Sequence, residues 1–368
     1  SKPRFVGDGQ LVELGSICEL VMGQSPSSDT YNADGEGLPF YQGNADFGEK
    51  NPIPHVWCTE PKKVAEKGDI LISVRAPIGA INIASEQCCI GRGVAAIRPR
   101  LDFISADFLM HQLLASRKKL ELMGTGSTFK AVGKKALNGF AISIYPKGDQ
   151  DIIADQLDCI IQQIKATETQ VVQLDQLVKS RFVEMFGDPA LNPMKWDIGT
   201  IESYCDNLDS RRVPITQGNR IDGSYPYIGA SGVVDHVANY LFDETLLLIS
   251  EDGANLLART SPIAFTISGK AWVNNHAHVL RCRDDETRVY LQTLINMLDI
   301  SLYVSGSAQP KLSQKQMNRI PIMLPSRKLL VEFAAFVSQV DKSRFIAQQQ
   351  IEKLQMLYDS LAQDYFGD

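Results

Sequence analysis

The sequence contains neither a long hydrophobic run nor a paired-cysteine motif. No apolar stretch approaches the ~18 residues that a membrane-spanning helix needs. Residues 1–7 contain no apolar core and no small-residue cleavage site, so nothing indicates a secretory signal. The seven cysteines are odd in number and form no Cys-x-x-Cys pair, which disfavours a disulfide framework or a zinc site. We therefore expect a cytoplasmic protein with no membrane partner.

Motifs for nucleotide binding and nucleophilic catalysis are also missing. Neither Gly-x4-Gly-Lys-[Ser/Thr] nor Gly-x-Gly-x-x-Gly occurs, so an ATPase or dinucleotide enzyme is not expected. Ser73, Ser250 and the scattered histidines form no nucleophile elbow or triad order. His276 and His278 could supply half of a metal site from one face of a strand, but no Asp, Glu or Cys stands nearby at ligand spacing. We predict no metal and no catalytic residue, and favour a structural or DNA-facing role for these histidines.

Charge of either sign is unevenly distributed. The formal net charge of -6 disfavours nucleic-acid binding if the charges are spread evenly, because phosphate affinity comes from clustered Lys and Arg. Between residues 117 and 147, however, seven basic residues face one acid, Glu121, whereas the balance reverses between residues 149 and 188. A basic surface therefore alternates with an acidic one.

The feature that is present most clearly is an internal repeat with an offset of 180 residues. The whole chain has 368 residues, which are enough for two hydrophobic cores. The segment 126–130 recurs at 306–310, and Phe186-Gly187-Asp188 recurs as Phe366-Gly367-Asp368. The offset is constant across these matches, so we expect two copies of one unit.

Each copy contains a long heptad pattern, whose apolar positions step by four and three residues. In the first copy these positions are Ile153, Leu157, Ile160, Ile164, Thr167, Val171, Leu174, Val178, Arg181 and Met185. In the second they are Phe333, Val337, Val340, Arg344, Ala347, Ile351, Leu354, Tyr358, Leu361 and Tyr365. Each helix could pack only on its own globular domain, but nearly five heptads is a long seam for a small domain to cover, which favours pairing of the two helices.

The remaining parts of each copy are mixed and rich in short strands. Apolar runs at 69–74 and 246–250 end at glycine-containing turns, and further strands are predicted at 80–84, 94–98, 263–267 and 279–282. Helices are fewer, with one predicted over 105–122 and its counterpart over 287–298. Both globular parts therefore belong to the α+β class.

Polar loops occupy equivalent places in the two copies, at 23–31 and 209–217. They could be ordinary turns. Their Gln, Ser and Arg side chains are also those that bond base edges and phosphates, with Arg suited to guanine and Gln or Asn to adenine. The turns at 126–130 and 306–311 lead into basic stretches, as expected of phosphate-facing segments.

Taken in order, these segments resemble the specificity subunit of Type I restriction-modification enzymes across essentially the whole chain. The resemblance depends on Gly23-Gln24-Ser25-Pro26-Ser27, on the strand and turn at 69–79, on Ser127-Thr128-Phe129-Lys130 with its twin at Ser307, and on the helix end at 180–189. Each motif is weak alone, but their duplicated order between heptad helices is specific.

The resemblance implies two target recognition domains, each reading one half of a split DNA sequence, joined by a long antiparallel coiled coil of two helices with an internal pseudo-twofold repeat. The expected boundaries are residues 1–148 and 189–326 for the domains, and 149–188 and 327–368 for the spacer helices. It also implies that partner subunits perform the catalysis. Modification subunits, two of them, would bind S-adenosylmethionine and methylate adenine, and restriction subunits would use ATP and Mg, while this chain binds no cofactor. Because the polar loops of the two copies differ, the target is expected to be asymmetric double-stranded DNA.

Residue-level contacts are predicted from side-chain type and loop position. In the first domain the expected DNA-binding residues are Gln24, Ser25, Ser27, Tyr31, Arg75, Arg92, Lys130 and Lys134. In the second they are Arg211, Arg212, Gln217, Asn274, Asn275, His276 and Lys311. Two other classes stay open from the residues alone: a protein-interaction scaffold built on the heptad helices, and a self-contained methyltransferase or nuclease with an unrecognised motif.

Overall fold

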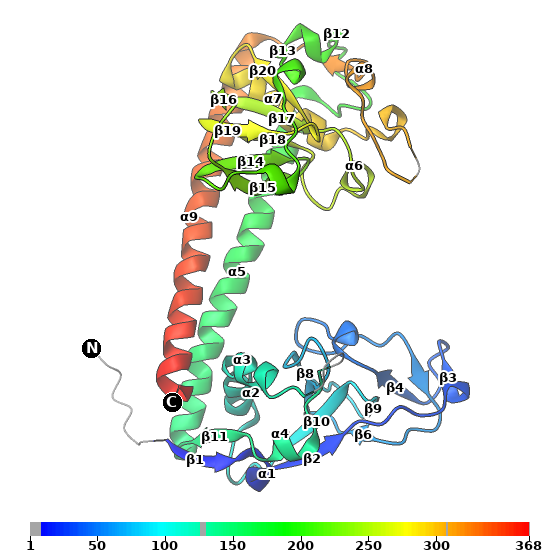
Figure 1. Ribbon diagram of the computed structural model, residues 1–368, viewed down its shortest axis with the longest axis vertical. Coiled ribbons are helices and arrows are strands. Elements are labelled where there is room, and N and C mark those ends of the chain that lie inside the picture. Colours follow the sequence, from blue (N-terminus) through cyan, green and yellow to red (C-terminus); the bar gives the residue numbers. More distant parts are fainter. Residues whose placement is uncertain (1–8, 126–129, 307, 368) are drawn as a thin grey trace. The chain divides into compact units, whose positions relative to one another are not determined.

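The computed structural model describes residues 9–125, 130–306 and 308–367, which divide into two compact units. Unit 1 contains residues 1–167 and 349–368, and unit 2 contains residues 168–348. Each unit combines a strand-rich globular part with segments of two long helices, α5 (Lys147–Phe186) and α9 (Arg327–Phe366) (Figure 1). No helix within the described residues is both long and apolar enough to span a bilayer.

Unit 1 is built on an antiparallel sheet with the strand order β2-β10-β7-β8. Its strands are β2 (Cys18–Met22), β7 (Ile70–Ser73), β8 (Ile81–Ile83) and β10 (Val94–Pro99). Because successive side chains of a strand point to opposite faces, Ile70 and Ile72 enter the core beside the helices, whereas Leu71 enters a second core. Burial on both faces explains why this strand is a continuous apolar run.

A second sheet of unit 1 has the order β3-β5-β4-β9-β6, and a separate ribbon joins β1 to β11. These strands are β1 (Gln10–Glu13), β3 (Tyr31–Asn32), β4 (Leu38–Tyr41), β5 (Trp57–Cys58), β6 (Val64–Ala65), β9 (Cys88–Ile90) and β11 (Ala141–Ile144). The helices of its globular part are α1 (Leu14–Ile17), α2 (Ala106–Ala115), α3 (Arg117–Leu122), α4 (Lys134–Asn138), η1 (Ser28–Thr30) and η2 (Asn44–Asp46). The helix predicted over 105–122 is therefore interrupted at Ser116, between α2 and α3.

Unit 2 repeats the central sheet with the equivalent order β13-β20-β17-β18. Its strands are β13 (Cys205–Asn207), β17 (Leu246–Ser250), β18 (Ala264–Ile267) and β20 (Ala277–Cys282). Here too the central strand serves two cores, with Leu247 and Ile249 on the helix side and Leu246 and Leu248 on the other. The sequence repeat is thus a repeat of sheet topology.

The second sheet of unit 2 has the order β15-β14-β19-β16, and β12 pairs with β21. These strands are β12 (Ile198–Gly199), β14 (Tyr225–Gly229), β15 (Gly232–Val237), β16 (Phe242–Asp243), β19 (Lys270–Val273) and β21 (Ile322–Met323). The helices are α6 (Asn255–Ala258), α7 (Asp285–Met297), α8 (Gln314–Met317), η3 (Ile201–Ser203), η4 (Asp209–Arg211), η5 (Gln217–Asn219) and η6 (Ser301–Tyr303). Asp284 caps α7 by accepting a hydrogen bond from the Thr287 amide.

The long helices pair antiparallel within each unit. In unit 1 the start of α5, with Ile153 and Leu157, shares a core with Tyr358 and Phe366 from the end of α9. In unit 2 the end of α5 packs against the start of α9, and the rings of Phe182 and Phe333 meet edge to face at 5.5 Å. These same residues pack on the globular cores, so pairing of the helices and packing on a domain occur together.

The predicted seam positions all lie on the covered side of their helices. Those that are buried are Ile153, Leu157, Ile160, Thr167, Val178, Met185, Phe333, Val337, Val340, Ala347, Tyr358 and Tyr365. Those that are half-buried are Ile164, Val171, Leu174, Arg181, Arg344, Ile351, Leu354 and Leu361. Phe182 and Phe186 lie outside the predicted pattern but are fully buried.

Helix α5 ends at Phe186, before Pro189 and Pro193. Gly187 has a φ of +83°, and its amide donates to the carbonyl of Val183 at 2.8 Å. A left-handed residue directly after a helix suits glycine, because other residues strain there. The helix therefore ends at a glycine cap, and Pro189 and Pro193 belong to the connection that follows.

Candidate nucleic-acid interface

Each unit has a surface hollow at one end of its central sheet. Hollow 1, in unit 1, has a volume of about 260 Å³ and is lined by Ser25, Gln42, Gly43, Asn44, Arg75, Ala76, Arg92 and Gly93. Hollow 2, in unit 2, has a volume of about 650 Å³ and is lined by Pro214, Ile215, Thr216, Arg220, Tyr227, Gly229, Ala230, Val234, Asp252, Asn274, Asn275 and His276. Six of the predicted DNA-binding residues line these hollows: Ser25, Arg75 and Arg92 in the first, and Asn274, Asn275 and His276 in the second.

Backbone hydrogen bonds show that the two hollows occupy equivalent positions. Beyond β7 the amide of Val74 donates to the carbonyl of Gly93 at 2.9 Å, and beyond β17 the amide of Glu251 donates to His276 at 2.8 Å. The next residues, Arg75 and Asp252, form isolated bridges with Ala131 and Lys311, which are 180 residues apart. Arg75 and Asp252 are therefore equivalent.

Backbone pairing also matches the opposite walls of the two hollows. Strand β4 runs parallel to β9, and β14 runs parallel to β19. Just beyond β9 the Gly91 amide donates to the carbonyl oxygen of Tyr41 at 2.8 Å. Just beyond β19 the Asn274 amide donates to the carbonyl oxygen of Ile228 at 3.0 Å. Counting on by one residue, Arg92 corresponds to Asn275.

Hollow 1 presents two arginines to the solvent. The side chains of Arg75 and Arg92 are exposed, and neither guanidinium forms a hydrogen bond or an ion pair with any residue that the structure describes. The wall beside them is braced, because the Asp46 carboxylate accepts hydrogen bonds from the amides of Gln42 and Gly43 at 2.6 and 3.2 Å. Two cations without a partner among the described residues therefore lie beside a braced wall.

The other residues predicted in unit 1 lie outside hollow 1. Gln24 and Ser27 are exposed, as are Lys130 and Lys134 on either side of the bridge residue Ala131. The motif at 126–129 and its twin Ser307 lie outside the described residues, so their expected phosphate contacts stay predictions.

Tyr31 has an internal role. Its hydroxyl donates to the carbonyl of Pro26 at 2.9 Å, and its ring lies 4.8 Å from that of Phe40. Burial is the main reason why the pKa of Tyr31 is raised, and Arg92 partly offsets it. The tyrosine braces the loop that carries Ser25, and a DNA contact by its hydroxyl would require that bond to break.

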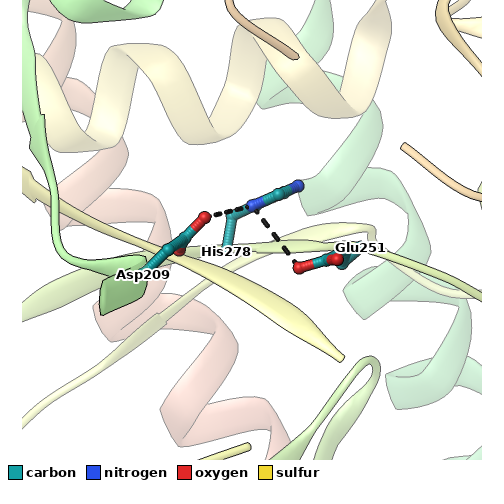
Figure 2. Close-up of side chains that lie close together, drawn as sticks. All are labelled: Asp209, Glu251 and His278. Carbon is teal, nitrogen blue, oxygen red and sulfur yellow. Dashed lines mark hydrogen bonds and ion pairs between the residues drawn. The ribbon is translucent and has the colours of Figure 1, made fainter. Parts of the chain in front are cut away.

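In unit 2 the polar loop is tied down by a buried ion network, which Figure 2 shows in part. His278 on β20 places Nδ1 2.6 Å from Asp209 Oδ2, and Nε2 2.8 Å from the carbonyl of Leu312. Arg212 donates to Glu251 at 2.6 Å and lies 3.4 Å from Asp209. Both ring nitrogens of His278 therefore face oxygen atoms.

The two carboxylates of this network are held in their charged forms. Burial alone would raise the pKa of Asp209, but the hydrogen bond from His278 and the charge of Arg212 leave it below its ordinary value. At Glu251 burial again acts to raise the pKa. Arg212, His278 and Lys311 outweigh this effect, so the pKa of Glu251 is also lowered. Asp209, Glu251 and His278 offer three ligand-type atoms within 4.8 Å of one another. Since Arg212 and Lys311 already neutralise the carboxylates, the group is better described as an ion network than as a cation site.

The structure corrects the expectation that no acidic residue accompanies the two histidines. Asp209 and Glu251 reach His278, and Asp252 lies 2.8 Å from Nδ1 of His276, all from distant parts of the sequence. His278 is buried and structural, whereas His276 is exposed and lines hollow 2. The two imidazoles therefore do not share a site.

The remaining predicted residues of unit 2 divide in the same way. Arg211 is half-exposed, bonds Glu244 at 3.3 Å and lies over the ring of Phe242 at 4.7 Å. Lys311 lies 3.1 Å from Glu251. Asn274 is buried and accepts a hydrogen bond from the His276 amide, whereas Asn275 and Gln217 are exposed. Arg212 is an internal tie of the loop, and its contact with DNA stays an untested prediction.

Several residues of the hollows were not predicted from the sequence. Gln42 and Asn44 follow the apolar strand β4, Arg220 directly follows η5, and Val234 lies on β15. A polar, glycine-containing segment after an apolar run was a usable signal for Gln42. Asp252 belongs to a turn that the sequence did predict, and only its equivalence to Arg75 marks it as a wall of the hollow.

Comparison with known proteins gives this geometry its context. Two segments of the chain, residues 7–176 and 193–356, match the Type I restriction modification DNA specificity domain. The chain belongs to this family. One match covers each unit's globular part, in agreement with the repeated sheet topology.

Relatives within the family support the assignment at different lengths. The putative Type I restriction enzyme MjaX specificity subunit of Methanocaldococcus jannaschii is 40% identical over 174 residues, which cover 47% of this chain and 41% of the relative. The MjaIX specificity subunit of the same organism is 22% identical over 401 aligned positions, covering 96% of this chain and 91% of the relative. For MjaX and for a putative specificity subunit of Haemophilus influenzae, the match spans less than half of the relative's length, at 41% and 34%.

A solved structure extends the likeness of fold over the whole chain. The S subunit of a Type I restriction-modification system from M. genitalium has a TM-score of 0.58 and is 14% identical, covering 99% of this chain and 98% of that one. At this identity the likeness concerns the fold alone. The expected α+β architecture of two recognition domains with a coiled coil is thereby confirmed.

Proposed function

We propose that this chain recognises a bipartite, asymmetric DNA target and directs a separate adenine methyltransferase and an ATP-dependent endonuclease to it. The observation that supports this most strongly is one backbone frame present twice with different side chains at equivalent positions, as at Arg75 and Asp252. A common frame lets both hollows meet duplex DNA in the same way, while different side chains read different bases.

Partners and cofactors follow from the same proposal. Two modification subunits would dock, one for each copy of the frame, and they would carry S-adenosylmethionine. Restriction subunits would carry ATP and Mg, and this chain would bind none of these. We place the complex in the cytoplasm, which agrees with the seven free cysteines. The proposed division is into recognition domains at 1–148 and 189–326 and spacer helices at 149–188 and 327–368.

The test is to express the full chain with its modification partner in a methylation-deficient host and to map methyladenine by genome sequencing. The expected result is a single motif with two short specific halves and a fixed gap, which disappears when this chain is omitted. Purified chain alone should bind duplex DNA weakly, with an affinity that falls as salt rises.

Two results would overturn the proposal in favour of the other classes. Methylation or cleavage of DNA by the purified chain without partners would identify an enzyme. Failure to bind any DNA, even with the modification partner present, would identify a protein-interaction scaffold.

A further inference from the structure

We infer that hollow 1 reads a G·C base pair and hollow 2 an A·T base pair, so that the two half-sites differ in base class. This inference rests on the proposed function, and it goes beyond it by assigning a chemical preference to each domain. It is carried by the side chains that the common frame places at matching points of the two hollows, Arg75 against Asp252 and Arg92 against Asn275.

Hollow 1 offers a strong set of donors for acceptor atoms. A guanidinium carries five N–H donors and no acceptor, and Arg75 and Arg92 have no carboxylate partner among the described residues. Guanine presents two acceptors in the major groove, N7 and O6, and bidentate arginine is the commonest specific contact to them. Adenine, by contrast, presents a donor beside its acceptor, so a paired arginine fork fits it less well.

Gly93 allows the braced backbone of Gln42 to lie close to the backbone beside Arg92. A Cβ atom at this position would lie 2.2 Å from the carbonyl oxygen of Gln42, a backbone atom that a rotamer change cannot move. The loop of Gln42 can therefore lie directly beside Arg92 only because residue 93 has no side chain. The equivalent residue in unit 2 is His276, so this close approach is special to hollow 1.

Within the described part of the chain, hollow 2 has no arginine or lysine without a partner. Its one lining arginine, Arg220, donates to Asp235 at 2.8 Å and lies 4.3 Å over the ring of Tyr227, so its charge and its donors are engaged within the protein. Where hollow 1 has Arg75, hollow 2 has the Asp252 carboxylate, which is bonded to His276. A negative group at this point disfavours the acceptor-rich edge of guanine.

The groups left free in hollow 2 match an A·T pair. Asn275 is exposed, and its amide carries a donor beside an acceptor, the pattern that matches adenine N7 and N6. Apolar side chains, those of Pro214, Ile215 and Val234, line the same hollow. Apolar side chains contact the thymine methyl group, which only an A·T pair presents.

The experiment uses the full chain with its modification partner and selects bound duplexes from a pool with randomised half-sites. Arg75→Ala and Arg92→Ala should each lower the preference at a G·C position by about 10-fold, in one half-site only. The matched control is Arg100→Ala, an exposed arginine just beyond the opposite end of β10, which should leave the motif unchanged. When 7-deazaguanine, which lacks N7, replaces guanine, the affinity of the wild-type protein should fall by a similar factor. The affinity of the variant that lacks the arginine contacting N7 should not change.

Hollow 2 is tested in the other half-site of the same pool. Asn275→Ala should lower the preference at an A·T position by about 10-fold, while Asn239→Ala, an exposed asparagine outside the hollow, should not. Replacing thymine by uracil removes the methyl group and should weaken binding of the wild-type protein, but not of Val234→Ala. Unchanged thermal midpoints of all variants would show that the substitutions act on recognition.

The outcomes separate this inference from the proposed function. If the arginine variants weaken binding to all sequences equally, the two arginines contact phosphate and the inference is wrong, while a bipartite motif would still support the proposed function. The inference also fails if the arginine variants alter an A·T position, or if Asn275→Ala alters a G·C one. A wild-type complex that enriches no motif at all would overturn the proposed function and the inference together.

Discussion

At the scale of single residues, the same side chain has different roles one position apart. Arg211 is half-exposed and pairs with Glu244 on the surface, whereas Arg212 is largely buried between Glu251 and Asp209. Surface pairs contribute little because water screens them, but removing one partner of a buried network leaves uncompensated charge. Residue type alone therefore does not tell a reading arginine from a structural one.

The first prediction compares these neighbours. Arg212→Ala should lower the free energy of unfolding by about 3 kcal/mol, because Asp209 and Glu251 keep their charges in a buried site. Arg211→Ala, the matched control, should cost less than about 1 kcal/mol. Chemical denaturation of both variants measures the difference, and equal small losses would show that the network does not stabilise unit 2.

The same network sets a response to acid. Because the folded-state pKa values of Asp209 and Glu251 are lowered, their contribution to stability is complete above the ordinary carboxylate range and is lost as pH falls through the folded values. A double variant, Asp209→Asn with Glu251→Gln, should be less stable at neutral pH and should lose less stability below pH 4.5. Thermal midpoints recorded from pH 7 to pH 3 check this slope.

His111 gives unit 1 a pH response of its own. It is fully buried, with Nε2 3.0 Å from Asp158 and Nδ1 3.1 Å from the Tyr358 hydroxyl. Burial lowers the pKa of His111 below its ordinary 6.5, although the Asp158 carboxylate partly opposes this. The unfolded chain therefore takes up the proton first as pH falls.

The second prediction follows from that sign. Stability is fully present above pH 6.5 and should decline as pH falls from there toward the folded-state pKa, by up to about 1.4 kcal/mol per pH unit. His111→Gln should remove this slope, and His55→Gln, at an exposed histidine of unit 1, should retain it. Unfolding free energies at pH 7.5 and 5.5 decide the matter, and identical slopes in all three proteins would contradict the assignment.

At the scale of elements, the ends of the long helices are parts of the globular cores. Phe182 near the end of α5 contacts Phe186, Tyr290 and Phe333, with ring centroids 4.9 to 5.5 Å apart. The end of α9 repeats this in unit 1, where the rings of Phe366 and Phe108 lie 5.3 Å apart. Each helix end therefore anchors a domain as well as a coiled coil.

The third prediction concerns this anchor. Phe182→Ala should lower the unfolding free energy by about 3 to 5 kcal/mol, because it removes a fully buried aromatic side chain and leaves a cavity. Lys179→Ala, on the exposed side of the same helix, should change it by less than about 0.5 kcal/mol. A loss below 1 kcal/mol for Phe182→Ala in urea denaturation would mean that the aromatic cluster is dispensable.

At the scale of the whole molecule, the proposed function requires a chain of net negative charge to bind DNA, a polyanion, through local basic surface. The formal charge is -6, yet the segment 117–147 is strongly basic and contains the exposed residues Lys130 and Lys134. Contacts to phosphate carry no sequence information, so they should set affinity and its salt dependence without setting the motif.

The fourth prediction uses this distinction. Replacing Lys130 and Lys134 by Gln should weaken binding to all duplexes and reduce the slope of log K against log salt by about 1 for each lost contact. The selected motif should stay the same, unlike the result expected for Arg75→Ala. Binding titrations at several salt concentrations measure the slope, and an altered motif would show that these lysines read bases.

The sequence by itself determined the frame of this protein. Constant offset, heptad spacing and short apolar runs are local or periodic signals, and they predicted the duplicated unit, both 40-residue helices and strands such as β17. Such signals survive in the sequence because every turn of a helix and every second strand residue must meet a core.

Only the tertiary structure decided which polar residues are available to a ligand. Arg75 and Arg92 line the same hollow without a partner among the described residues, whereas Arg212 is paired with Asp209 and Glu251. The equivalence of Arg75 and Asp252 is likewise invisible in the sequence, since it is defined by hydrogen bonds between distant strands. Whether a charged side chain forms an ion pair depends on residues that are distant in the sequence. No local sequence pattern therefore predicts which charged side chains are paired.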